Sequence, residues 1–225
     1  MRSFQPDRRK NRWKTAPLLL IALNMTGCGG MSTPSSAPDS TPSHHSHSSQ
    51  QEASSPSLSV LGQIQPFTLQ STTGQQVSLD KDLQAKTKLV YFFYTNCPDV
   101  CPITTKRMEN MLQLMKQQNL SSSDVKLISI TLDPKRDTQE AIQQFSKKYK
   151  VDPAYWFFLR GDAEQTKSIM NQFHADADEL PSGMFMHSDR MYLLDDKNQL
   201  RATYVMGTDV KDEDVVNDVK KLLGK

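Results

Sequence analysis

Two cysteines four positions apart offer the clearest chemistry in this 225-residue chain. Cys97 and Cys101 follow the apolar run KLVYFFY at 88–94, which predicts a strand buried on both faces. A helix is predicted from Pro102 to about residue 118, because proline is favoured in a first helical turn. The positive end of a helix dipole favours thiolate over thiol. The pair therefore indicates redox chemistry, binding of a soft metal ion, or both.

The spacing of the two thiols bears on which chemistry they perform. Three residues separate them, whereas dithiol oxidoreductases of the thioredoxin type have two. Positions four apart in a regular helix place their Cβ atoms ~5–6 Å from each other, while a disulfide needs ~3.5–4.5 Å. The pair could close only if Pro98 to Val100 bends out of the helix, and otherwise the gap suits a metal ion. A structural disulfide is disfavoured, because so short a loop stabilises little.

Alternating strands and helices must position this pair. A hairpin is predicted at 67–70 and 76–79 around Gly74. The other predicted elements are a buried strand at 125–132, a helix from Asp137 or Thr138 to about 149, a strand at 156–159, a helix from Asp162 to 173, a hairpin of 191–194 with 201–205, and a helix at 211–223. This order predicts an α/β sandwich, and the cysteine position makes it thioredoxin-like. The N-terminal β-hairpin and the inserted helix at 162–173 are additions to that fold.

A third ligand would come from one of two histidines in the predicted domain. His174 ends a polar helix, and we expect it to be exposed. His187 comes just before the strand at 191–194, and in a thioredoxin-like fold the loop there faces the cysteine pair. Oxidoreductases of this fold place a cis-proline in that loop, and this chain has none after Ser182. Two thiolates and an imidazole suit Cu(I), and with a weaker further ligand also Cu(II). Zinc fits less well, because a structural zinc site takes four ligands.

The first residues carry the pattern of an export signal. Residues 1–27 combine six basic side chains, a short apolar run and small residues before Cys28, which predicts a signal peptide. The apolar run at 16–23 is shorter than the ~20 residues that span a bilayer. Cys28 after Thr26-Gly27 is similar to the lipobox of bacterial lipoproteins, with Met25 where leucine is usual. We therefore expect a lipoprotein signal and lipidation of Cys28; the alternative is an ordinary signal peptide with an incidental cysteine.

Composition then divides the remaining chain. Residues 28–57 are rich in Ser, Pro and His and predict a disordered, lipid-anchored tether, whereas 58–225 suit one globular domain. The tether holds His44, His45 and His47, which could collect copper weakly, although we interpret them as part of a polar linker. The chain has 27 basic and 25 acidic residues. Without residues 1–27, 21 basic and 24 acidic residues remain, a net charge of −3 that gives no indication of a nucleic-acid surface.

Three motifs over about residues 60–223 together resemble the Sco/SenC family. They are YTNCPDVCP at 94–102, SITLDPKRDT at 129–138, and His187-Ser188 followed by YLLD at 192–195. The resemblance implies a membrane-tethered protein on the outer face of the bacterial cytoplasmic membrane that binds one copper ion through Cys97, Cys101 and His187. It further implies a role in assembling the dinuclear copper centre of cytochrome c oxidase subunit II, as copper chaperone, as thiol reductant, or as both. A copper donor and a thiol reductant are implied as further partners.

One departure from the family precedes the histidine. Many relatives carry Asp there, whereas this chain has Met186, so an acid that tunes the site or receives a partner is missing. Met186 could approach Cu(I) as a soft ligand, but we expect it to pack. Asp133, Arg136 and Asp137 by themselves predict a turn and a helix cap. The resemblance adds a role in shaping the copper loop or a partner surface.

Two other functions remain open for the same cysteines. A metal-free thiol–disulfide oxidoreductase is disfavoured by the missing cis-proline and the three-residue spacing. A thiol peroxidase of the peroxiredoxin kind would have Thr three positions before the cysteine, and Thr95 is two before Cys97. A redox or copper sensor would use the same ligands and would differ in its partner. Met108, Met111 and Met115 lie at helical spacing and are predicted to be core, as is Trp156, rather than a copper-binding cluster.

Overall fold

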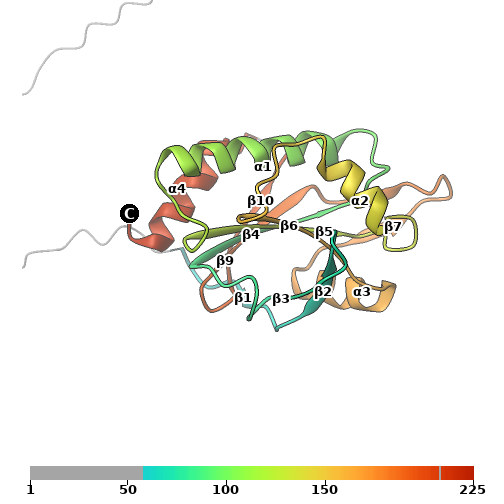
Figure 1. Cartoon of the computed structure of the whole chain (residues 1–225), viewed down its shortest axis with the longest axis horizontal. Helices are drawn as coiled ribbons and strands as arrows, with labels where there is room; N and C mark the ends of the chain where they lie inside the picture. The colour runs from blue at the N-terminus through green and yellow to red at the C-terminus, as the bar shows by residue number, and fades with distance from the viewer. Residues whose placement is uncertain (1–57, 208) are drawn as a thin grey trace, which may run out of the picture. The chain divides into compact units, whose positions relative to one another are not determined.

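The computed structural model describes residues 58–207 and 209–225 (Figure 1). The predicted signal peptide, the tether with its histidines, and Cys28 lie outside the described residues. Of the helices in the described part, none combines the length and the apolar character that a membrane crossing needs.

A mixed sheet of eight strands forms the centre of the described domain (Figure 1). Its spatial order is β1-β10-β9-β4-β5-β6-β2-β3. The strands are β1 (Gly62–Gln63), β2 (Thr68–Ser71), β3 (Gln76–Ser78), β4 (Thr87–Phe93), β5 (Val125–Thr131), β6 (Trp156–Arg160), β9 (Arg190–Asp195) and β10 (Gln199–Val205). β4 runs parallel to β5, and β5 to β6, whereas the other neighbours are antiparallel. All seven residues of the central strand β4 are buried, as its continuous apolar run predicted.

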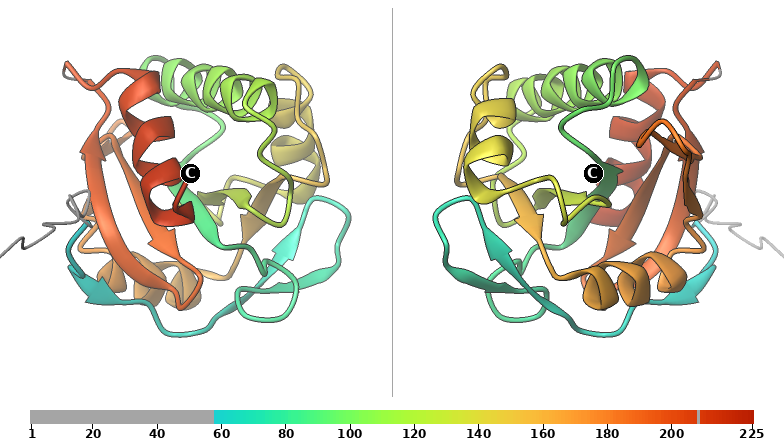
Figure 2. Two further views of the ribbon diagram at one scale, coloured as in Figure 1. Left: turned by 90° about the vertical axis from the view of Figure 1, so that its left-hand side faces the viewer. Right: turned by 90° about the vertical axis from the view of Figure 1, so that its right-hand side faces the viewer.

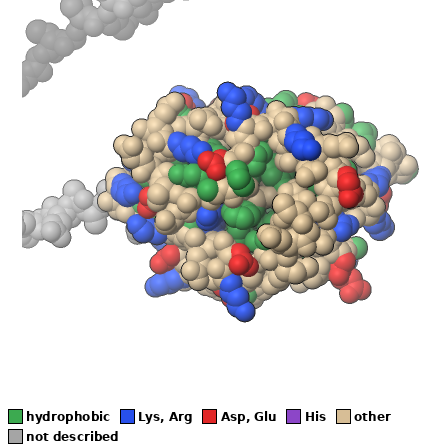
Figure 3. Space-filling model, in the orientation of Figure 1, with side chains coloured by type: hydrophobic (Ala, Val, Ile, Leu, Met, Phe, Trp, Pro, Cys, Tyr) green, Lys and Arg blue, Asp and Glu red, His purple; other side chains and the backbone are tan. Residues whose placement is uncertain are grey.

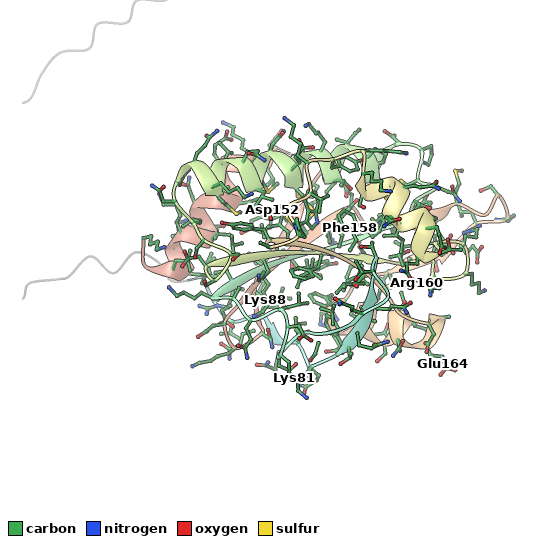
Figure 4. The ribbon with its side chains drawn as sticks, viewed as in Figure 1. Lys81, Lys88, Asp152, Phe158, Arg160 and Glu164 are labelled. Atoms are coloured by element: carbon green, nitrogen blue, oxygen red, sulfur yellow. The ribbon has the colours of Figure 1, made fainter. Side chains whose placement is uncertain are left out.

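Helices cover both faces of this sheet. α1 (Val100–Gln117), α2 (Gln139–Ser146) and α4 (Asp212–Leu223) lie on one face, and α3 (Ala163–Gln172) lies on the other (Figures 1 and 2). Phe145 of α2 packs against Phe93 of β4, with ring centroids 5.2 Å apart, and against Phe158 of β6 (labelled in Figure 4), at 6.3 Å. The preceding Phe92 points the other way and meets Phe173, after α3, at 5.5 Å. The predicted thioredoxin-like sandwich is confirmed.

The two additions to the minimal fold are present. The early hairpin is formed by β2 and β3 and joins the sheet through β6. The inserted helix α3 begins after Asp162, whose carboxylate accepts a bond of 2.8 Å from the backbone N–H of Gln165. Of the two candidate caps for α2, Thr138 is the one used, because its hydroxyl accepts from the backbone N–H of Ala141. That helix ends at Ser146, before the expected residue 149.

Three short strands were not expected from the sequence. β1 pairs with β10 at the sheet edge. β7 (Ala177–Glu179) and β8 (Phe185–His187) pair with each other in a separate two-stranded sheet, here called the ribbon. The ribbon matters for function because it contains His187, which was expected in a loop.

The remaining predictions for the core hold in the described part. Met108, Met111 and Met115 are fully buried on α1 and Trp156 is buried on β6, so all four belong to the core. On the face seen in Figure 3, basic and acidic side chains are interspersed.

Candidate metal centre

The cysteine pair lies at the carboxyl end of β4, where the chain turns into α1. The helix begins at Val100, two residues earlier than expected, so Cys101 is in its first turn and Cys97 precedes it. The backbone N–H of Cys101 donates to the Cys97 sulfur at 3.3 Å, which satisfies a donor that a helix start leaves free. Pro98 and Asp99 bend outside the helix. A disulfide was expected to require that Pro98 to Val100 leave the helix; Pro98 and Asp99 do so, Val100 begins the helix, and both thiols are free here.

The ribbon contributes His187, which completes the cluster with the two cysteines. This histidine is the last residue of β8, in register with Ala177 of β7. Its Nε2 lies 3.7 Å from the Cys101 sulfur. The Cys97 and Cys101 sulfurs and a His187 ring nitrogen all lie within 4.8 Å of one another. The structure thus brings together the three residues that the sequence analysis singled out.

The tautomer of His187 follows from its other ring nitrogen. Nδ1 lies 3.3 Å from the carbonyl oxygen of Ser188. A carbonyl can only accept, so Nδ1 carries the proton and Nε2 keeps a lone pair that faces the sulfurs. Metal-binding histidines commonly have this arrangement, with one nitrogen on the metal and the other on a backbone oxygen.

The two thiols differ in their acidity. Hydrogen bonding from the Cys101 thiol, aided by the backbone N–H groups of Cys101 and Asp99, holds the pKa of Cys97 well below its ordinary value. The same Cys97 thiolate, together with burial, raises the pKa of Cys101. At neutral pH the metal-free site therefore holds one thiolate and one thiol. A metal ion that binds both sulfurs must displace the Cys101 proton.

Aromatic side chains shield the histidine side of the site. The rings of Tyr94 and His187 have centroids 5.9 Å apart, and those of Tyr94 and Phe185 are 5.5 Å apart. The backbone N–H of Phe185 also donates to the Tyr94 hydroxyl, at 3.4 Å. Cys101 is fully buried and Cys97 is 7% exposed. Sulfur ligands shielded from water in this way favour a soft metal ion.

Asp137, in the loop after β5, positions the cysteine segment. Its carboxylate accepts from the backbone N–H of Thr95 at 3.1 Å, and from the hydroxyls of Thr95 and Thr131. Thr95 comes two residues before Cys97. The carboxylate that was a candidate helix cap therefore holds the segment that leads into Cys97.

Arg136, the preceding residue, instead contacts the ribbon. Its guanidinium pairs with Asp133, lies 3.3 Å from the Glu179 carboxylate of β7, and is 5.4 Å from the centre of the Phe185 ring of β8. Gly183, at φ +77°, lies so close that an added Cβ would approach the guanidinium to 2.6 Å. The loop of 133–137 thus contacts both segments that supply ligands. Glu179 had no signal in the sequence, because its role depends on a pairing of strands that the local pattern does not encode.

The other candidates lie away from the sulfurs. Met186 is 62% exposed, so its expected packing role is wrong. Because neighbouring strand residues face opposite sides, Met186 and His187 point in opposite directions, and a thioether of Met186 is not part of this site. His174 is exposed after α3, as predicted.

Comparisons with known proteins agree with this geometry. The SCO1/SenC family model matches residues 60–224. The SCO1 protein homolog of Bacillus subtilis is 28% identical over 162 residues, covering 70% of this chain and 81% of that protein. The structure of Bradyrhizobium japonicum ScoI with copper bound is 26% identical, has a TM-score of 0.60, and covers 72% of this chain and 99% of that one.

A second structure concerns thiol chemistry. It is that of BsSco, described as a member of the Sco family of cytochrome c oxidase assembly proteins with a disulfide switch. This protein is 27% identical, with a TM-score of 0.64, and the match covers 73% of this chain and 95% of that one. The family match spans nearly all of the described domain and includes both cysteines and the histidine. This chain belongs to the SCO1/SenC family.

Proposed function

We propose that this protein binds one copper ion through Cys97, Cys101 and His187 and acts in the assembly of cytochrome c oxidase. The observation that carries the proposal is the convergence of two sulfurs and one imidazole nitrogen within 4.8 Å. Its relatives support the same function, since one was solved with copper bound and another is described as an oxidase assembly protein.

The donor set fits copper better than it fits zinc. Two thiolates and a neutral imidazole are soft or borderline ligands, which suit Cu(I) and, with a further weak ligand, Cu(II). The Nε2 lone pair of His187 and the thiolate of Cys97 are available before the metal arrives. A structural zinc site would take a fourth ligand, and the described residues place three such groups together.

The test is a titration of the reduced full-length protein, in mild detergent, with Cu(I) against a competing chelator. We expect one tight equivalent, which His187→Ala weakens and Cys101→Ser abolishes. His174→Ala is the matched control, because this exposed histidine lies after α3, and it should bind like the wild type. Wild-type protein with no tight equivalent, or indifference to His187→Ala, would leave a metal-free thiol oxidoreductase as the better account.

We further propose that the protein delivers copper to the dinuclear copper centre in subunit II of the oxidase. Deletion in the source bacterium should then lower oxidase activity, and added copper should restore part of it. Normal oxidase activity at limiting copper would contradict an assembly role. If the oxidase assembles but copper-dependent signalling is lost, the protein is a sensor rather than a chaperone.

Reduction of a disulfide in the copper site of subunit II is a second candidate function. The observation that favours it is the bend at Pro98 and Asp99, which lets the two sulfurs approach outside helical geometry. We expect the reduced protein to convert a disulfide in a peptide of the subunit II copper site to thiols, while Cys97 and Cys101 form a disulfide. Protein that oxidises readily but leaves this peptide unreduced would exclude the role.

Lipidation of Cys28 and attachment to the outer face of the cytoplasmic membrane are also proposed. The support is the basic and apolar pattern of residues 1–27 and the Thr-Gly-Cys sequence at 26–28. Mass spectrometry of the purified protein should find an N-terminal diacylated Cys28. Cys28→Ala should release the protein from the membrane fraction, and a soluble wild-type protein with unmodified Cys28 would contradict the proposal.

A further inference from the structure

A half-buried carboxylate lies beside the metal centre and has no part in the binding described above. Asp189 comes two residues after His187, between β8 and β9. The Thr104 hydroxyl, on the same helix as Cys101 and one turn farther along, lies 2.8 and 3.1 Å from the two carboxylate oxygens and donates to them. Asp189 therefore joins the segment that carries His187 to the helix that carries Cys101.

Asp189 also interacts electrostatically with the site. Burial raises the pKa of Asp189, whereas the hydrogen bond from Thr104 lowers it and the negative charge of Cys97 raises it further. The Tyr91 hydroxyl, fully buried on β4, has no hydrogen bond of ordinary geometry within the described residues. Burial raises the pKa of Tyr91, and its interactions with Cys101 and Asp189 raise it further. The carboxylate and the sulfurs thus share one poorly solvated environment.

The net charge of a loaded site depends on the copper ion. Two thiolates and a neutral imidazole give a net charge of −1 with Cu(I) and 0 with Cu(II). A nearby negative charge in partly buried surroundings raises the free energy of the more negative assembly. We propose that Asp189 favours Cu(II) over Cu(I) at this centre, and so determines which copper ion the protein holds more tightly. This inference rests on the proposed copper-binding function.

The test uses the full-length protein in detergent and the Asp189→Asn variant. Asn keeps an oxygen that can accept from Thr104 but removes the charge. Affinities for Cu(I) and Cu(II), each measured against a chelator, give their ratio, and electrochemistry gives the reduction potential independently. We expect Asp189→Asn to shift the ratio toward Cu(I) by roughly tenfold, which corresponds to about 59 mV for a one-electron couple.

Three further variants separate charge from structure. Asp189→Glu should keep the wild-type ratio, because it keeps the charge. Asp178→Asn removes an exposed acid from β7, where solvent screens it, and should change nothing. Thr104→Val removes the hydrogen bond and keeps the charge. Its ratio of Cu(I) to Cu(II) affinity should therefore stay closer to that of the wild type than the ratio of Asp189→Asn does. If Asp189→Asn does not fold, Asp189→Ser removes the same charge with a smaller side chain.

Two results would overturn this inference and leave the proposed copper-binding function intact. One is an unchanged ratio of Cu(I) to Cu(II) affinity in Asp189→Asn. The other is a shift in Thr104→Val as large as that in Asp189→Asn, which would assign the effect to the position of the helix. Wild-type protein that binds neither ion would refute the proposed function, and the inference with it. These outcomes are distinguishable because the wild-type titration is read first.

Discussion

The cysteines and the histidine are held by two regions of different construction. Cys101 is fully buried at the start of α1, directly after β4, which pairs with β5 on one side and β9 on the other. His187 ends β8, whose three residues are paired only with β7 and are exposed or partly exposed. One side of the site belongs to the domain core, and the other lies on a small separate sheet.

This difference indicates how each side is kept in place. Two short strands are marginally stable by themselves, so the ribbon depends on the contacts that its Glu179 and Phe185 make with Arg136 and Tyr94. The cysteine side needs no such support beyond the core and Asp137. Changes on the cysteine side should therefore affect folding and metal binding together, whereas changes on the histidine side should affect metal binding alone.

The largest expected effect is that of Asp137→Ala. The substitution leaves the buried N–H of Thr95 and the hydroxyl of Thr131 without their acceptor. We expect the free energy of unfolding to fall by about 2–4 kcal/mol, measured by urea denaturation, with weaker Cu(I) binding in the same variant. Glu140→Ala, at an exposed acid in the first turn of α2, is the control. A free energy of unfolding equal to that of the wild type in Asp137→Ala would show that the hydrogen bonds of Asp137 do not hold the cysteine segment in place.

Arg136→Ala should give the opposite pattern. Loss of the contacts with Glu179 and Phe185 frees the ribbon, and we expect Cu(I) affinity to fall by roughly 10–100-fold, as is typical when a group supporting a ligand is removed. The urea midpoint should change much less than in Asp137→Ala. Lys135→Ala is the matched control, because this neighbouring cation is exposed. A stability loss as large as that of Asp137→Ala would remove the distinction between the two sides.

Hydrogen exchange should show the same contrast without any substitution. Backbone amides of β8 should exchange far faster than those of β4 in the metal-free protein, because a small sheet opens locally and a central strand opens only on global unfolding. Cu(I) should slow exchange in β8 and leave β4 nearly unchanged. Equal protection of β8 with and without copper, measured by mass spectrometry, would mean that the histidine side is already fixed.

The smallest effect is expected from Met186→Ala. Met186 is 62% exposed and faces away from His187, so Cu(I) affinity should not change measurably. A clear loss of affinity in the same chelator competition would mean that the thioether reaches the metal, and that the ribbon can turn its other face to the sulfurs.

Much of the fold could be predicted because its signals are local. The apolar run of β4, the caps at Thr138 and Asp162, and the helical spacing of the α1 methionines each depend on a few adjacent residues. The ribbon could not be predicted in this way. Its strands ADE and FMH have neither alternation nor continuous apolar character, and they form by pairing with each other and by contact with Arg136.

The site was predicted in its residues but not in its geometry. Chemistry and the family resemblance singled out Cys97, Cys101 and His187, which the structure brings together. The start of α1 at Val100 was missed, since Pro102 is acceptable anywhere in the first turn. The exposure of Met186 was missed because the face on which a strand residue lies follows from pairing, and that strand was not expected.

The described chain begins at the end of the sheet opposite the metal centre. The carbonyl of Leu58 accepts from Arg201, which pairs with Asp195, and Asp195 stands beside Thr87 at the start of β4. The cysteines follow the other end of that strand, about 20 Å away at ~3.3 Å per residue. A protein anchored through residues before Leu58 would therefore carry its copper at the far tip of the domain. The proposed anchoring before Leu58 would thus place the metal centre at the end of the domain away from the first described residue.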